Sequence, residues 1–246
     1  MVEKDVGFVL RRHNFRETSV IASLYTLRFG KITGILKGFY TQKKEFSSNL
    51  DIFSLNELVF YPKKRDIWLI SFTDLVHDYD FLRKDIAKAT VAALFLNLID
   101  RTMQPWDVNY EVFALLKNAL LALEQGEEKK ICYMFLIKFL TISGFKPEFN
   151  KCIMCHGRIQ EESVFSVSRG GLVCGDCHGQ VGDARKISKE TISSLVYIQN
   201  SEFSLMLRLN PSRDCEKEIT YILREFLCYH LDFDIQAPAQ RKRLPA

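Results

Sequence analysis

Two Cys-x-x-Cys pairs are the residues of this sequence whose spacing most clearly predicts chemistry. Cys152 and Cys155 form the first pair, and Cys174 and Cys177 form the second after eighteen intervening residues. Each pair can place two thiolates on one edge of a tetrahedron, and two pairs at this separation are typical of a zinc site. Four protein ligands leave no open position on the metal. The sequence therefore predicts one structural Zn²⁺ ion bound by all four cysteines.

Three other interpretations of the cysteines compete with this one. Each pair is followed by a histidine, His156 or His178, so each also matches the C-x-x-C-H signature of haem attachment. A haem needs an apolar shell, however, and the segment between the pairs is short and polar. Either histidine could instead replace a neighbouring cysteine as a zinc ligand. Disulfides are the third alternative, and an odd total of seven cysteines disfavours them. Zinc bound by four thiolates is the favoured interpretation.

The segment between the two pairs predicts a short hairpin. Residues 164–174 alternate apolar and polar side chains around Gly170-Gly171, as two short strands joined by a turn would. We expect a metal-binding insertion over residues 148–183 whose ends the ion holds together.

Charge is distributed unevenly along the chain. The 246 residues are 47% hydrophobic and 26% charged, which are ordinary values for a globular protein of one or two domains. The net charge is only +4, but residues 1–50 alone hold nine Lys and Arg against four Asp and Glu. This surplus indicates an anionic partner for the N-terminal part. No stretch resembles a signal peptide or a membrane span, so we expect a cytoplasmic, nucleoid-associated protein with no membrane partner.

The periodicity of the sequence predicts an α+β multidomain fold. Residues 1–79 contain five short strand-like segments, which suggest an OB-fold barrel, with an SH3-like barrel as the alternative. Residues 80–246 change to helical spacing and predict an all-α domain that carries the Cys₄ insertion. Pro105 should break the first helical stretch, Ser188 should cap a helix, and residues 213–231 should form the last helix.

Basic and aromatic residues alternate in the connections predicted for the barrel. Cations in such loops bind phosphates while exposed rings stack on bases, which suits a polynucleotide. We place Arg11, Arg12 and Arg16 in the first connection and residues 63–65 in the turn between the fourth and fifth strands. The plain alternative is a set of solvated turns, with Phe39 and Tyr40 in the core or at an interface. The candidate DNA-binding residues are Arg11, Arg12, Arg16, Lys37, Phe39, Tyr40, Lys43, Lys44, Lys63, Lys64 and Arg65.

The sequence contains no recognisable catalytic motif. There is no Walker loop, G-x-S-x-G elbow, H-E-x-x-H helix or paired-carboxylate arrangement. Asp74, Asp78 and Asp80 could be taken for the metal site of a nuclease, but their spacing is not that of a known cation site. We therefore expect a protein that is not an enzyme.

Several short motifs, taken in order, resemble those of one protein family. They are Gly7-Phe-Val-Leu followed by Glu17-Thr18, Phe29-Gly-Lys-Ile-Thr33 followed by Lys37-Gly38, Ser143-Gly-Phe-Lys-Pro147 before the first cysteine pair, and Gly170-Gly171 before the second. Together with a barrel, a helical domain and a Cys₄ insertion, they resemble the bacterial RecO family of DNA repair and recombination proteins almost from end to end. That family usually has a glycine before the Glu-Thr pair, where this chain has Arg16.

The resemblance implies a non-enzymatic mediator of homologous recombination in the RecF pathway. Proteins of this family bind single- and double-stranded DNA through the OB-fold and anneal complementary strands. They bind RecR and act with single-strand-binding protein, whose C-terminal tail docks on the helical domain, to load RecA onto DNA. The alternative is an OB-fold and zinc-ribbon protein that binds RNA or serves as a scaffold for other proteins.

Overall fold

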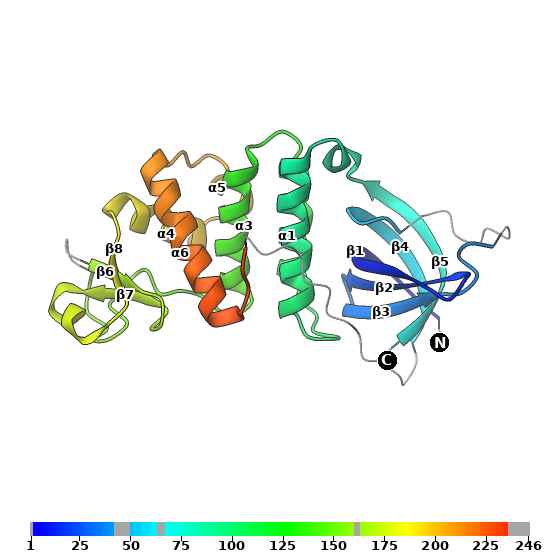
Figure 1. The fold of residues 1–246 in the computed structure, drawn as a ribbon, viewed down its shortest axis with the longest axis horizontal. Coiled ribbons are helices and arrows are strands. Elements are labelled where there is room, and N and C mark those ends of the chain that lie inside the picture. The colour runs from blue at the N-terminus through cyan, green and yellow to red at the C-terminus, as the bar shows by residue number, and fades with distance from the viewer. Residues whose placement is uncertain (1, 42–49, 63–66, 160–162, 236–246) are drawn as a thin grey trace. The chain divides into compact units, whose positions relative to one another are not determined.

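The computed structural model describes residues 2–41, 50–62, 67–159 and 163–235 (Figure 1). Its contacts divide the chain into two compact units, residues 1–125 and residues 126–246. The first unit holds a barrel and two helices, and the second holds further helices and a small sheet.

Five strands close the barrel of the first unit. They are β1 (Glu3–Phe15), β2 (Ser19–Thr26), β3 (Gly30–Leu36), β4 (Ser54–Tyr61) and β5 (Ile67–Asp78). Their order around the barrel is β1-β2-β3-β5-β4, with β3 and β5 parallel and the other pairs antiparallel. Closure leaves no free sheet edge. The predicted five-stranded barrel of the OB type is confirmed.

Strand β2 is buried along its whole length because both of its faces are covered. One face, with Ala22 and Leu24, contributes to the core inside the barrel. The other face carries Ser23 and Tyr25, which contact residues of the two helices of this unit. The centre of the Tyr25 ring lies 6.4 Å from the centre of the Phe113 ring. The barrel and these helices therefore share a hydrophobic core.

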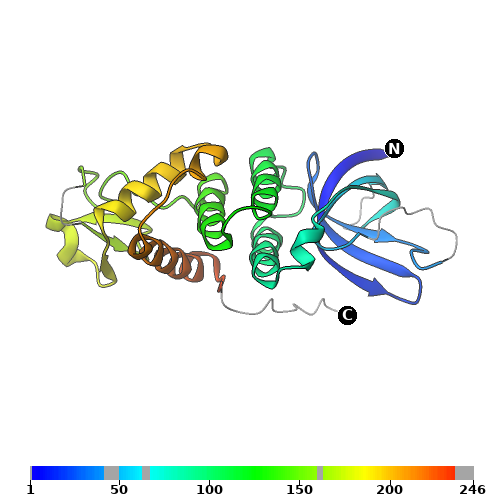
Figure 2. The same cartoon turned by 90° about the horizontal axis from the view of Figure 1, so that it is seen from above.

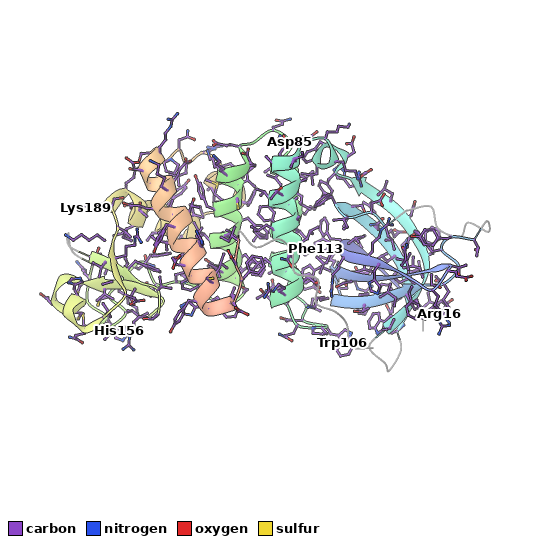
Figure 3. All side chains as sticks on the ribbon, in the orientation of Figure 1. Arg16, Asp85, Trp106, Phe113, His156 and Lys189 are labelled. Atoms are coloured by element: carbon purple, nitrogen blue, oxygen red, sulfur yellow. The ribbon has the colours of Figure 1, made fainter. Side chains whose placement is uncertain are left out.

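A single 3₁₀ turn (η1, Asp80–Arg83) leads from the barrel to helices α1 (Ile86–Thr102) and α2 (Tyr110–Ala122). Asp85 and Asn109 cap these helices by accepting hydrogen bonds from backbone amides of the first turn. The predicted break at Pro105 is confirmed, since it lies between α1 and α2. Figure 2 shows the two helices side by side next to the barrel. Phe113 of α2 lies on the barrel side (Figure 3), with its ring 5.1 Å from that of Phe8.

The second unit combines helices with a three-stranded sheet. Its helices are α3 (Glu128–Ile142), α4 (Lys189–Asn200), α5 (Phe203–Met206) and α6 (Arg213–Leu231). Ser188 caps α4 as predicted, by accepting from the Thr191 amide, and α6 has the predicted bounds. The sheet contains β6 (Ser163–Ser166), β7 (Gly171–Cys174) and β8 (Ala184–Lys186) in the order β7-β6-β8, and the 3₁₀ helix η2 (Gly175–Gln180) follows β7.

The predicted hairpin is formed by β6 and β7. Their register pairs Ser163 with Cys174 and Ser166 with Gly171. Gly170 has a φ of +74°, which a glycine adopts without steric cost, and it ends the turn between the strands. Among the described residues, no helix combines the length and the apolar character that a bilayer span requires.

Candidate metal centre and nucleic-acid surface

The four predicted cysteine ligands converge on one point. Their Sγ atoms all lie within 4.8 Å of one another, and Cys155 Sγ is 3.7 Å from Cys174 Sγ. Four sulfurs about 2.3 Å from a zinc ion stand about 3.8 Å apart at the corners of a tetrahedron. A disulfide needs an S–S distance of about 2.05 Å, and all of these cysteines are free thiols. The cluster has the size and donor set of a four-thiolate metal site.

The first cysteine pair is shaped by a tight turn of the backbone. The Cys152 amide donates to the Gly157 carbonyl and the His156 amide donates to the Cys152 carbonyl, both at 2.9 Å. The Cys174 amide approaches Cys152 Sγ at 3.4 Å, which joins the two pairs. His156 is exposed (Figure 3), and neither it nor His178 belongs to the converging ligand group. The geometry thus favours four sulfur ligands over a histidine substitution or a haem.

The environment of the cluster favours a thiolate at Cys152 and disfavours one at Cys177. Burial raises the pKa of Cys152, but the amides of Cys155, Cys174 and Met154 point toward its sulfur and lower that pKa to about 6. A hydrogen bond with Cys174, together with burial, raises the pKa of Cys177 to about 12. Several thiolates this close repel one another unless a cation lies between them. The cluster can hold a metal ion, and its charge balance favours one.

The cysteines also form the core of the small sheet region. Cys152, Cys174 and Cys177 are buried together with Val164 and Val173, and a few partly buried side chains complete the group. A core of this size is too small to hold such a region together by apolar burial alone. A bound ion would therefore stabilise the fold of the region.

The hairpin of this region is attached to the end of α6. His230 Nε2 lies 2.7 Å from the Val167 carbonyl oxygen in the turn between β6 and β7. The Phe226 ring packs at 4.2 Å from the His230 ring, and both side chains approach Gly170. The geometry of the metal cluster is thereby connected to the helices of the second unit.

Several predicted DNA-binding residues meet at one end of the barrel. Tyr40 donates its hydroxyl to Asn14 Oδ1 at 2.7 Å, and its amide donates to the Thr18 carbonyl at 3.3 Å. These bonds hold the turn after β3 against the β1–β2 turn. Phe15, Arg16, Lys37 and Tyr40 are exposed there, whereas Phe39 is half-buried against the barrel core. We call Asn14, Phe15, Arg16, Lys37 and Tyr40 the barrel-tip surface.

The β1–β2 turn places a residue other than glycine in the left-handed region of backbone conformation. Arg16 has a φ of +54°, in the left-handed region, at the position where the resemblance leads one to expect glycine. In Figure 3, Arg16 lies at the end of the barrel remote from Phe113. Its guanidinium stands 5.3 Å from the centre of the Phe15 ring. The turn therefore presents an exposed cation at a backbone position that favours glycine.

Arg11 and Arg12 do not lie in the first connection, and that part of the prediction is wrong. Both are inside β1, paired with Ser23 and Ala22, because the strand continues to Phe15. Arg11 Nε lies 2.9 Å from Asp100 Oδ2, and Arg12 Nη2 lies 3.3 Å from Asp51 Oδ1. Their side chains are 50% and 30% exposed, so each is accessible but already paired with a carboxylate.

The remaining candidates are the other predicted DNA-binding cations and the aspartates considered as a metal site. Lys43, Lys44, Lys63, Lys64 and Arg65 lie outside the described residues. Asp78 and Asp80 form ion pairs with Arg83 and Lys84 at 2.6 Å. Among the residues that the structure describes, the cysteine group is the one set of three or more potential ligands that converges.

Two features of the site region carry no signal in the sequence. Asp100 of α1 accepts from Ser23 Oγ at 3.0 Å besides pairing with Arg11, and its carbonyl oxygen accepts from Lys31 Nζ at 2.6 Å.

In the second unit, residues of β8 and α6 line a pocket of about 290 Å³. The Arg185 guanidinium lies 3.6 Å from the centre of the Tyr221 ring. The pocket is lined by Arg185, Lys186, Ile187, Lys217, Glu218, Tyr221 and Ile222.

Comparison with known proteins accounts for nearly the whole chain. The family model described as Recombination protein O N terminal matches residues 1–79, and the one described as Recombination protein O C terminal matches residues 83–237. The chain is 28% identical over 241 residues to the DNA repair protein RecO of Syntrophus aciditrophicus, covering 95% of this chain and 93% of that protein. It is 27% identical over 234 residues to the DNA repair protein RecO of Alkaliphilus metalliredigens, covering 94% and 95%. With a closed barrel, a helical region and a four-cysteine cluster in the same order, the chain belongs to the RecO family of DNA repair proteins.

Proposed function

We propose that this protein is a recombination mediator that binds single- and double-stranded DNA and anneals complementary strands. With RecR, it helps to load RecA onto DNA coated by single-strand-binding protein. The observation that carries the proposal is the match of both family models, which together account for residues 1–79 and 83–237. Cations and exposed rings gathered at one end of an OB-type barrel support the DNA-binding part.

DNA is proposed to bind first at the barrel-tip surface. Arg16 and Lys37 are exposed there and form no ion pair with a described carboxylate, so both can contact phosphates directly. Arg11 and Arg12 can contribute only by exchanging Asp100 and Asp51 for phosphate oxygens. Binding through phosphates should depend strongly on salt and leave base edges free to pair with a second strand. The complete proposed set is Arg11, Arg12, Arg16, Lys37, Phe39, Tyr40, Lys43, Lys44, Lys63, Lys64 and Arg65.

The metal is proposed to be a single Zn²⁺ ion held by Cys152, Cys155, Cys174 and Cys177. Bound zinc would supply structural crosslinking, since four thiolates complete its coordination and leave no site for substrate or water. The residues of this chain position the segments that the ion would crosslink. Cys174 and Cys177 fix the end of β7 and the start of η2, and the His230 contact with Val167 transmits that order to α6.

The acidic tail of single-strand-binding protein is proposed to dock in the pocket between β8 and α6. Three cations, Arg185, Lys186 and Lys217, border the pocket, while Ile187 and Ile222 supply apolar surface. Glu218 is the one acidic side chain among the lining residues, and it accepts three hydrogen bonds from Ser188 and Thr191. A cationic rim over an apolar floor suits a peptide that has acidic residues and an apolar end.

The protein is proposed to act without catalysing a chemical reaction. The test mixes two complementary fluorescently labelled oligonucleotides with the purified protein, without ATP, and follows pairing with time. Annealing should be faster with protein, and neither strand should be cut when Mg²⁺ is added. Cleavage would favour a nuclease that uses the region of Asp74. Binding of RNA but not DNA, or of proteins alone, would favour the RNA-binding or scaffold alternative.

A further inference from the structure

The β1–β2 turn carries a conformational cost at Arg16. Its φ of +54° lies in the left-handed region, where the side chain of an L-residue crowds the following carbonyl oxygen. The turn comprises residues 16–18 between the paired Phe15 and Ser19, which leaves little freedom to relax. A glycine would adopt the same backbone conformation without this crowding.

No contact that Arg16 makes with a described residue offsets that cost. The side chain is exposed, and its ring contact is with Phe15, which is itself 36% exposed. An exposed contact of this kind contributes little to stability. Arg16 forms no ion pair with any carboxylate that the structure describes, and its sequence neighbour Glu17 is also exposed. The described contacts of Arg16 therefore provide no stabilisation that matches the cost of its backbone conformation.

The surroundings of the guanidinium suit a phosphate. The Phe15 ring supports one side of it, and its N–H donors are left without a described acceptor. Lys37 and Tyr40 are exposed on the adjoining turn, which the bond from Tyr40 to Asn14 holds in place. A planar guanidinium with free donors matches phosphate oxygens two at a time, which a lysine does not.

We propose that Arg16 is a dedicated phosphate contact, kept at a backbone position that its own side chain destabilises. The inference rests on the proposed DNA-binding function and adds to it. Arg16 contributes to DNA binding and to folding with opposite signs, so a glycine at this position would give a more stable protein that binds DNA less well.

Two substitutions separate the two contributions. Arg16→Gly and Arg16→Ala both remove the guanidinium and its contact with Phe15, and they differ in how well the backbone tolerates a positive φ. The glycine variant should melt about 2–4 °C above the alanine variant. Both should bind a labelled oligothymidylate about tenfold more weakly than wild type in low salt. The slope of log affinity against log salt should fall by about 0.7 in both, the value for one phosphate contact on a single strand.

Arg16→Lys and Lys117→Gln serve as controls. The lysine variant should keep the salt slope and regain part of the affinity. Lys117 is an exposed cation of α2, and its loss should change neither melting nor binding. Unchanged affinity in both Arg16 variants, with wild type binding well, would overturn the inference and leave the proposed function standing. An alanine variant as stable as the glycine variant would also overturn it. Failure of wild type to bind would refute the proposed function itself.

Discussion

Arg11 Nε lies 2.9 Å from Asp100 Oδ2, and this ion pair joins strand β1 to helix α1. Ser23 donates to the other carboxylate oxygen of Asp100 at 3.0 Å, so both oxygens are occupied by side chains of the barrel. Asp100 is 13% exposed, whereas Arg11 is 50% exposed. The cations of the barrel thus have two roles. Arg11 connects the barrel to α1, whereas Arg16 and Lys37 of the barrel-tip surface are exposed to a ligand.

Replacing Asp100 should weaken that connection. Asp100→Asn removes the charge that balances Arg11 and should lower the free energy of unfolding by about 1–2 kcal/mol, since the pair is partly screened by solvent. The melting temperature should fall by about 2–6 °C. DNA affinity should rise slightly, because Arg11 becomes available to phosphate. Asp214→Asn is the matched control, since Asp214 is 88% exposed and its pairing with Lys217 should matter little. Equal melting of both variants would contradict this account of Asp100.

The shared core of barrel and helices should make Phe113 essential to the first unit. Its ring is 5% exposed and packs against Phe8 and Tyr25. Phe113→Ala should destabilise by about 3–5 kcal/mol, as loss of a buried aromatic ring does elsewhere. Denaturant unfolding followed by circular dichroism would measure this. Leu121→Ala, at a 39% exposed position of α2, should cost far less.

Because the barrel and the two helices of the first unit share this core, a fragment of residues 1–125 should fold. A fragment of residues 1–79 alone should be less stable and bind hydrophobic dyes.

Glu218 should make the second unit sensitive to acid. Burial raises its pKa, but hydrogen bonds from Thr191 and Ser188 outweigh burial and hold the pKa below its ordinary value. A carboxylate with a lowered folded-state pKa stabilises the protein above its unfolded-state pKa, and that contribution is lost as pH falls through the folded-state pKa.

Glu218→Gln should therefore lower the melting temperature at pH 7, and the difference from wild type should shrink as the pH falls through the folded-state pKa of Glu218. Glu202→Gln, at an exposed glutamate, should behave as wild type throughout. A difference in melting temperature between Glu218→Gln and wild type that stays constant from pH 7 to pH 3 would contradict this account. It would show that the stability of α4 does not depend on the charge of the Glu218 carboxylate.

Removing one metal ligand should remove the metal and its stabilisation together. Cys155 is the exposed member of the cluster, so Cys155→Ser leaves no cavity in the core. We expect loss of about one equivalent of zinc and a fall in melting temperature, because binding of a structural ion contributes directly to folding. Elemental analysis and thermal denaturation measure the two effects. Cys228→Ser, at an exposed cysteine outside the cluster, should alter neither. Full metal content in the Cys155 variant would contradict the four-thiolate site.

Features with local causes could be predicted from the sequence. The cysteine pairs, the hairpin around Gly170 and the helix capped by Ser188 each depend on residues a few positions apart. The bounds of α6 follow from its regular apolar spacing. The structure confirms these elements because short-range chemistry suffices to specify them.

Features that depend on distant partners could not be predicted. Arg11 and Arg12 follow the apolar part of β1 and look like a loop, but pairing with β2 extends the strand to Phe15. The role of Asp100 depends on Ser23, seventy-seven positions away in sequence. The backbone conformation of Arg16 is invisible in its residue type, since arginine seldom adopts a positive φ.

The central claim is that this chain holds DNA strands through their phosphates. The most direct measurement is the equilibrium affinity for DNA and RNA oligonucleotides of one sequence, taken by fluorescence anisotropy over a series of salt concentrations. We predict tight DNA binding in low salt that weakens linearly on a log–log plot, with a slope that reports several phosphate contacts. Absence of DNA binding in low salt, or binding of RNA alone, would contradict the account.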